Sequence, residues 1–393
     1  MKRGKEALKE LYNFEGFSFK EICKENSVII QMKKIRKTGI CPVCNKKRRK
    51  VIEIRIRKIR DDNIAKEKCF IVIKAYRIIC KGCYRGMEKL DFILPVERFT
   101  ERFANYICEL CEKMTLKDTA KMALIDWRTA KRIDKKKLKD RFKDLSKIKP
   151  KRIGVDEIAV EKGHKYLTIV RDIDAGVIWV GDKRKEETLN QFFFELGKRK
   201  CKNITVAVMD MWDPFIKSVK SNTNAEIVFD KFHIAKKVNE ALDSIRKSEF
   251  AKADPEERKM MKHKRFLILY RKKNLNKEQE EGLNELIKLN KKLYKAYILK
   301  EQVLSIFDRR QKNIALERLK IWKKNVHEAN IGEFHKLLKT LEHYLYGIEN
   351  YFTHHVTNGA SEGYNNKINI IKRRAYGFKD IEYFKLKILQ SCS

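Results

Sequence analysis

Apolar and polar residues alternate with a period of two in four stretches of the first hundred residues. This pattern predicts half-buried β-strands. The four stretches cover residues 17–23, 28–35, 51–59 and 69–79. The first two predict a hairpin, and the polar residues 60–63 are expected to join the last two. We therefore expect a small sheet at the start of the chain.

The periodicity then changes to that of short helices, expected over residues 102–114, 116–123 and 126–133. Three short helices with a tight turn and a basic last helix are typical of a helix-turn-helix, whose last helix enters the major groove of DNA. The alternative is a small packing bundle between domains. Candidate DNA contacts on the basic helix are Arg128, Lys131 and Arg132. Residues 135–149 predict a lysine-dense connector that ends at a domain boundary at Pro150.

Beyond Pro150, apolar strands alternate with amphipathic helices. Strands are expected over residues 152–160, 166–172, 176–181, 203–210 and 225–229, with helices over 186–198 and 214–219. Three consecutive strands followed by alternating helix and strand is the order of an RNase H-like α/β fold. In that order the first and fourth strands are neighbours. Residues 234–357 have helical periodicity throughout, which predicts an all-α insertion.

Three acidic residues stand out against this pattern. Asp156 interrupts an apolar, β-branched strand, where a carboxylate is costly unless a cation faces it. Asp210 ends the fourth strand, and Glu362 opens a late helix for which Ser361 is a suitable N-cap. We expect the three acids to meet and hold a divalent metal. The alternative for Glu362 is an ordinary acid favoured by the helix dipole.

Neighbouring residues give further candidates. Asp230 follows the last strand and precedes His233, although a histidine is more often packed or hydrogen-bonded than a ligand. Trp212, directly after an acid, either stacks on an unpaired base or packs in the core. Adjacent strand residues point to opposite faces, so Glu157 is expected to face away from Asp156.

The cysteines suggest a second metal site. Cys41-Pro-Val-Cys44 and Cys80-Lys-Gly-Cys83 lie at the two ends of the predicted long hairpin. Two tight turns of this kind give four thiolates the tetrahedral convergence that structural zinc requires. Cys108 and Cys111 have the same spacing but lie inside a predicted helix without a second pair, so they are expected not to bind metal.

Net charge narrows the class of partner. The 92 Lys and Arg against 53 Asp and Glu leave a charge of +39, which makes nucleic acid the default partner. A lysine-rich proteome is the alternative cause. A membrane surface is a weaker explanation, because the sequence has no lipidation motif and no apolar span of about 18 residues. The start lacks the apolar core of a signal peptide, so we expect a cytoplasmic, nucleoid-associated protein.

Several of these motifs occur together in one family. They are Gly154-Val155-Asp156, Asp210-Met211-Trp212, Asp230-Lys-Phe-His233, and Glu362-Gly-Tyr-Asn-Asn with the later Lys-Arg-Arg-Ala-Tyr-Gly-Phe. With the paired Cys-x-x-Cys motifs and the helix-turn-helix, the chain resembles the ISL-three family of prokaryotic insertion-sequence transposases.

The resemblance implies a DDE transposase that acts on the ends of its own element. Asp156, Asp210 and Glu362 would be the catalytic acids, with Mg²⁺ or Mn²⁺ as cofactor beside the zinc. Two such ions stabilise the attacking and leaving oxygens of a phosphodiester; water attacks first, and the freed 3′-hydroxyl then attacks target DNA. The partners would be double-stranded element-end and target DNA and further copies of the chain, assembled on DNA. The late helix adds candidate phosphate contacts at Lys367, Lys372, Arg373 and Arg374.

The expected domains follow from these assignments. They are the hairpin and zinc ribbon (1–95), the helix-turn-helix and connector (96–149), the first part of the core (150–233), the helical insertion (234–357) and the carboxyl-terminal core helix (358–393). Two alternatives remain at this stage. One is an RNase H-like nuclease that cuts without joining, and the other is a non-catalytic, zinc-containing DNA-binding regulator derived from a transposase.

Overall fold

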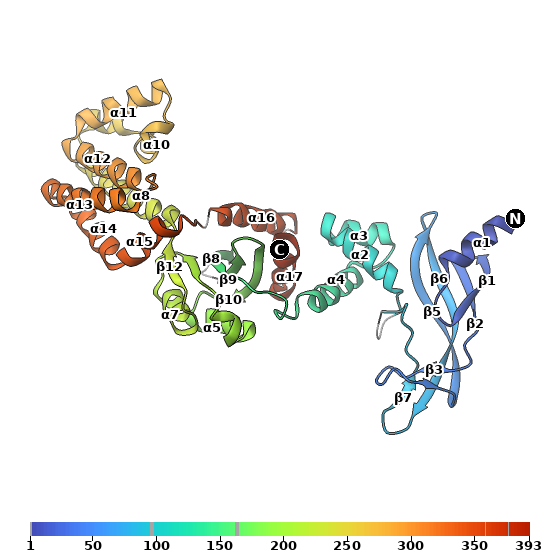
Figure 1. The fold of residues 1–393 in the computed structure, drawn as a ribbon. Helices are drawn as coiled ribbons and strands as arrows, with labels where there is room; N and C mark the ends of the chain where they lie inside the picture. Colours follow the sequence, from blue (N-terminus) through green and yellow to red (C-terminus); the bar gives the residue numbers. More distant parts are fainter. Residues whose placement is uncertain (1, 95–97, 162–164, 358, 376) are drawn as a thin grey trace. The chain divides into compact units, whose positions relative to one another are not determined.

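The computed structural model describes residues 2–94, 98–161, 165–357, 359–375 and 377–393, without the side chains of 2–5, 7, 161, 289 and 360–362. The chain divides into two compact units, Met1–Lys143 and Asp144–Ser393. Figure 1 shows the elements of each unit along the chain. None of the helices in these described ranges is long and apolar enough to cross a membrane.

A five-stranded sheet forms the body of the first unit. Strand β6 lies at its centre, parallel to β2 and antiparallel to β5 and β7, and β2 forms an antiparallel hairpin with β1. The elements are α1 (Lys2–Leu11), β1 (Phe17–Lys24), β2 (Val28–Lys34), β3 (Gly39–Ile40), β4 (Lys47–Arg48), β5 (Val51–Ile64), β6 (Glu67–Cys80) and β7 (Tyr84–Met87). The predicted strands are therefore confirmed.

The β5–β6 hairpin is longer than predicted. Residues 60–63 continue β5 instead of forming the turn, which falls at Ala65 and Lys66 with φ of 49° and 66°. Three of these polar residues, Arg60, Asp61 and Asn63, have hydrogen-bond partners later in the chain, which favours their place in the strand. The Arg102 guanidinium, for example, donates to the buried carboxylate of Asp61, with 2.8 Å between Nε and Oδ1. The polar composition of residues 60–63 therefore predicted the turn too early in the chain.

Three helices follow the sheet: α2 (Glu101–Lys113), α3 (Leu116–Ala123) and α4 (Trp127–Phe142). Thr100, Thr115 and Asp126 cap their amino termini with side-chain oxygens, as this residue type at an N-cap predicts. Helix α4 continues well past its predicted end, into the expected connector. Buried Leu138 and the ion pair of Lys137 with Glu101 of α2 hold this extension.

The second unit is built on a sheet with the strand order β10-β9-β8-β11-β12. Its strands are β8 (Arg152–Glu161), β9 (Lys165–Asp172), β10 (Gly176–Asp182), β11 (Val206–Met209) and β12 (Glu226–Phe229). The first three form an antiparallel meander, whereas β8, β11 and β12 run parallel. The predicted neighbourhood of the first and fourth strands is confirmed.

Helices cover both faces of this sheet (Figure 1). On one face, Val155 belongs to a core with Phe192 and Phe215 of the helices after β10 and β11. On the other, Ile158 packs with Ile368 and Phe384 of the two last helices. The helices are α5 (Glu186–Leu196), α6 (Lys198–Cys201), α7 (Asp213–Asn222), α16 (Ala360–Arg374) and α17 (Ile381–Cys392).

The last strand leads into the predicted helical insertion. Its elements are α8 (Lys231–Lys252), α9 (Pro255–Met261), α10 (Arg265–Leu269), η1 (Lys272–Asn274), α11 (Lys277–Leu289), α12 (Lys291–Ile306), α13 (Lys312–Ala329), α14 (Gly332–His343) and α15 (Leu345–His354). The insertion shares its core with the sheet, because α15 packs directly on β12 and the Asn350 amide donates to the Ile227 carbonyl oxygen at 2.9 Å.

Helix α16 begins earlier than predicted, so the assignment of Ser361 as its N-cap is wrong. The N-cap is Gly359, which already has helical dihedral angles. Glycine has no side chain that could cap the helix, and the Gly359 amide donates to the Thr357 hydroxyl at 3.3 Å.

Gly347 provides a test of the contact between the insertion and the sheet. A Cβ at this position would lie 2.4 Å from a ring carbon of Phe229 in β12. Alanine is normally favoured over glycine in a helix by about 1 kcal/mol, but overpacking costs about 1 to 3 kcal/mol. Gly347→Ala is therefore expected to lower the unfolding midpoint in denaturant titration of the purified protein.

Gly332→Ala in α14 is the matched control, because a Cβ there meets no atom within 4 Å. It should leave the midpoint unchanged or raise it slightly. If Gly347→Ala were as stable as Gly332→Ala, the packing of α15 on β12 would be incorrect.

Candidate catalytic site and metal centre

Two of the three predicted acids come from neighbouring parallel strands. Asp156 lies on β8, and Asp210 directly follows β11. The parallel register runs to Val208 and Gly154, so Asp210 and Asp156 follow at the same end of two adjacent strands. Both also lie near His233, whose Nδ1 is 3.4 Å from Asp210 and whose charge acts on Asp156. The chain order of the strands thus brings together two carboxylates that are far apart in sequence.

The Asp156 carboxylate is held from both sides. Its Oδ1 accepts from the Glu157 backbone N–H at 2.8 Å, and its Oδ2 accepts from the Asn365 side-chain amide of α16 at 3.1 Å. Burial raises the pKa of Asp156, and the nearby Asp230 carboxylate raises it further, while His233 opposes the rise. The charged form of this acid therefore lacks full compensation, which a bound cation would supply.

Asp210 faces the amino terminus of α8. One carboxylate oxygen accepts from the Met211 backbone N–H at 2.6 Å, and the other lies 3.4 Å from His233 Nδ1. Asp230 is the buried N-cap of α8 and accepts from the Phe232 backbone N–H at 3.2 Å. This cap fixes the turn that carries His233. Asp230 and His233, both predicted as accessory residues, thus lie beside the two acids.

Glu157 follows Asp156 on β8, and its carboxylate is 3.5 Å from Arg184. Burial and the charges of Asp156 and Asp210 raise the pKa of Glu157. The Arg184 guanidinium also lies over the rings of Tyr166 and Trp212, at 4.3 and 4.9 Å. Trp212 remains 36% exposed, so it is not a core residue.

The side chain of Glu362 lies outside the described residues. Its backbone belongs to the first turn of α16, three positions before Asn365. Positions three apart share one side of a helix, and Asn365 contacts Asp156 from this helix.

Sequence reasoning missed two residues at this site. One is Asn365, whose signal was its three-residue spacing from Glu362. The other is Arg171 of β9, buried opposite Gly154 with its guanidinium 5.8 Å from the Tyr364 ring. Burial lowers the pKa of Arg171, and the charges of Asp156 and Asp230 oppose this effect. The sequence indicated Arg171 by a single cation within an apolar strand, as it indicated Asp156 by a single acid within one.

The predicted DNA contacts fall into two groups, one in each unit. On α4, Arg128 is exposed with its guanidinium over the Trp127 ring at 5.2 Å, while Arg132 lies over Phe99 at 5.9 Å. The side chain of Lys131 is partly buried on the same helix. On α16 the four cations lie along the helix and in its last turn: Lys367, Lys372, Arg373 and Arg374.

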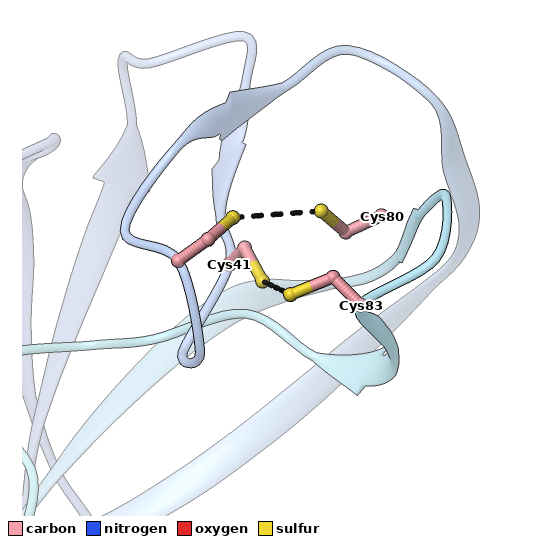
Figure 2. A group of neighbouring side chains, drawn as sticks. Cys41, Cys80 and Cys83 are labelled. Atoms are coloured by element: carbon pink, nitrogen blue, oxygen red, sulfur yellow. Dashed lines mark hydrogen bonds between the residues drawn. The ribbon is translucent and has the colours of Figure 1, made fainter.

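The four predicted zinc ligands form one cluster. Their sulfur atoms all lie within 4.8 Å of one another, with 3.7 Å between Cys41 and Cys83 and 3.6 Å between Cys44 and Cys80 (Figure 2). A tetrahedral zinc with bonds of about 2.3 Å requires sulfurs about 3.8 Å apart. The geometry of the cluster therefore fits zinc.

The electrostatics of this cluster also favour a bound cation. A hydrogen bond from the Lys46 backbone lowers the pKa of the Cys44 thiol to about 6. Burial and the neighbouring sulfurs raise the pKa of Cys83 to about 12. Arg48 donates to the Cys80 sulfur at 3.1 Å. Four thiolates this close are mutually repulsive, and a divalent cation relieves the repulsion.

The cysteine cluster is the one group of three or more candidate metal ligands, among the described residues, whose ligand atoms lie close enough to share an ion. In the part of the chain that the structure describes, no third ligand lies close enough to Asp156 and Asp210 to complete such a group. Their donor set is nevertheless suited to a hard cation such as Mg²⁺, which favours carboxylate oxygen and needs only one or two such ligands from protein.

Comparison with known proteins identifies the family. A family model described as transposase matches residues 153–388, and a zinc-finger model of the transposases IS204, IS1001, IS1096 and IS1165 matches residues 37–83. The chain is 30% identical to the transposase for insertion sequence element IS1001 of Bordetella parapertussis over 365 residues, which cover 91% of this chain and 90% of that protein. It is 27% identical to the transposase for insertion sequence element IS1557 of Mycobacterium tuberculosis over 308 residues, or 70% and 67% of the two chains.

The first model lies over the α/β unit that carries Asp156 and Asp210, and the second ends at the last cysteine of the cluster. With a family match over more than half of its length and a relative that aligns along nearly all of it, the chain belongs to the ISL-three family of insertion-sequence transposases.

Proposed function

We propose that this transposase binds the ends of its insertion sequence and catalyses metal-dependent strand cleavage and transfer with Asp156, Asp210 and Glu362. The observation that carries the proposal is the placement of Asp156 and Asp210 at adjacent parallel strands, with α16 held against Asp156 by Asn365. Glu362 lies in the turn of α16 before this contact, where the third acid is required.

Each residue then has a physical role. When bound, Mg²⁺ or Mn²⁺ supplies positive charge to the attacking and leaving oxygens of a phosphodiester. Asp156 and Asp210 offer carboxylate oxygens for this ion. Asn365 orients the first carboxylate, and His233 orients the second through the contact at 3.4 Å. Water is the first nucleophile, and the 3′-hydroxyl that it frees is the second.

The architecture supports this assignment. The strand order β10-β9-β8-β11-β12, with one antiparallel meander and two further parallel strands, is the arrangement of an RNase H-like core. Trp212 is exposed next to Asp210, with the partly buried Arg184 stacked on it, and this pair can contact an unpaired base.

We further propose that α2, α3 and α4 form a helix-turn-helix and that the four cysteines hold structural zinc. The basic helix α4 is the third of the set, and it presents Arg128 to solvent. For the functional parts we propose the boundaries expected from sequence, 1–95, 96–149, 150–233, 234–357 and 358–393, with α4 extending into the expected connector as far as Phe142. On DNA, several copies are expected to assemble, since the element has two ends.

The acids are tested by single substitutions. Asp156→Ala, Asp210→Ala and Glu362→Ala should each reduce cleavage of element ends by at least about a hundredfold, because each removes stabilisation of the transition-state charge. Binding of the same DNA should remain within about twofold, since the first unit makes the recognising contacts. Single-turnover cleavage and filter binding measure the two effects.

Asp174→Ala is the control for these variants. This carboxylate lies on the β9–β10 turn, pairs with Arg152 at the start of β8, and is exposed. It should retain normal cleavage. A Glu362→Ala protein that cuts at the normal rate would falsify the three-acid assignment, and cleavage without joining in a strand-transfer assay would indicate a nuclease instead.

The zinc proposal is tested by metal analysis. The purified protein should contain one zinc per chain, and Cys80→Ser should lose it together with much of the stability of the first unit, because binding free energy is also folding free energy here. Cys23→Ser, at a partly buried free thiol outside the cluster, should keep its zinc. Absence of zinc from the unmodified protein would contradict the proposal.

The recognition proposal is tested with a fragment of residues 1–150, which contains the whole first unit. It should bind element-end duplex in preference to scrambled duplex, and its affinity should fall by about 0.9 log units per log unit of salt for each phosphate contacted. Arg128→Ala should reduce the preference between the two duplexes, as expected for a residue that reads bases. Equal binding to the two duplexes by the unmodified fragment contradicts recognition by this unit.

A further inference from the structure

The helical insertion contains a basic cleft that the chemistry at Asp156 and Asp210 does not use. Its volume is about 660 Å³. It is formed by the turn between α12 and α13, the start of α8, the 3₁₀ segment η1 and the end of α15. The lining residues are Lys231, Lys273, Phe307, Asp308, Arg309, Arg310, Tyr351 and His355.

The cleft has more positive charge than its own acid can neutralise. Asp308 is the acidic residue of the lining, and its carboxylate already has three cationic neighbours, Lys273 at 3.0 Å, Arg271 at 3.0 Å and Lys231 at 3.8 Å. These contacts lower the pKa of Asp308, against the effect of its burial. Arg271 also pairs with Glu301 at 3.7 Å, but Lys231 and Lys273 together already exceed the single charge of Asp308.

Arg309 and Arg310 add to this surplus. Both are exposed at the α12–α13 turn, and no ion pair between described residues includes either of them. Like charges gathered in a concave surface raise the electrostatic potential there, which favours an anionic ligand. Guanidinium groups in particular match the geometry of phosphate oxygens.

The base of the cleft is aromatic and lies close to Asp230. The rings of Phe307 and Phe352 stack at 5.5 Å, and Tyr351 lies beside them. Burial raises the pKa of Tyr351, and the charges of both Asp230 and Asp308 contribute, so this side chain lies near both carboxylates. Lys231 also follows Asp230 directly in the chain. The basic cleft therefore begins at the carboxyl end of β12, next to the parallel end of β11 that Asp210 follows.

We propose that this cleft binds the sugar-phosphate backbone of DNA through Arg309 and Arg310, so that the insertion guides a strand toward Asp156 and Asp210. The inference rests on the proposed function for the identity of the polymer. An open cleft with cations from three separate parts of the chain suits a continuous backbone better than a single small anion, which would need an enclosed site.

The test uses the full chain and the double variant Arg309→Gln/Arg310→Gln. Affinity is measured by fluorescence anisotropy from low to moderate KCl, with Ca²⁺ in place of Mg²⁺ so that no DNA is cut. Three duplexes are compared: the terminal repeat alone, the repeat extended by flanking donor DNA, and an unrelated duplex as target. Loss of two phosphate contacts should reduce the slope of log affinity against log salt by about 1.8.

Lys320→Gln/Lys324→Gln is the matched control. It removes the same charge from exposed positions of α13, roughly 15 Å or more from Arg310 along the helix. Its slope should equal that of the unmodified protein. If the slope of the arginine variant falls on the extended duplex alone, the cleft binds the donor flank. If it falls on the unrelated duplex alone, the cleft binds target DNA.

The inference is overturned if the arginine variant keeps the unmodified slope on all three duplexes, or if the lysine variant loses as much. These outcomes do not depend on catalysis. If Asp156→Ala still cleaved DNA, the proposed function would fail while the slope of the arginine variant would still report on the cleft.

Discussion

The second unit is organised around a carboxylate that is costly to bury. Asp156 lies within a sheet, and its burial raises its pKa, so each element that reaches it offers partial compensation. Helix α16 supplies the Asn365 amide, α8 supplies His233 beside Asp210, and β9 supplies the buried Arg171. Strands and helices from both ends of the second unit therefore converge on one point. A bound cation would complete the compensation, and this is why a catalytic metal is the natural ligand.

This arrangement also explains how a long insertion is tolerated. The chain must return to the site only at α16, so the residues between β12 and α16 are free to form a separate layer of helices. That layer is not independent, since α15 packs on β12 and one hydrophobic core extends through both. The surplus positive charge lies on surfaces outside these cores, on α4, on α16 and at the α12–α13 turn. Repulsion among these cations is relieved when DNA phosphates share their charge.

Much of this could be predicted from sequence, because strand periodicity and strand order are local or nearly local properties. The pairing of β8 with β11 followed from the order of elements, and it placed Asp210 beside Asp156. The cysteine cluster followed from spacing. Residues that depend on tertiary partners were not predictable. The turn at Ala65 and Lys66 and the long α4 depend on buried partners, and Asn365 contacts an acid 209 positions away. The role of Glu362 remains a prediction.

The central claim is that three distant segments of the chain together hold the divalent metal. Affinity cleavage tests it directly: Fe²⁺ replaces Mg²⁺ in the zinc-loaded protein, and ascorbate with peroxide then generates radicals that cut the backbone close to the bound ion. The account predicts cuts near residues 156, 210 and 362, all suppressed by excess Mg²⁺ and all lost together in Asp156→Ala. Cuts near 156 and 210 without any near 362, or cuts that Mg²⁺ does not suppress, would contradict it.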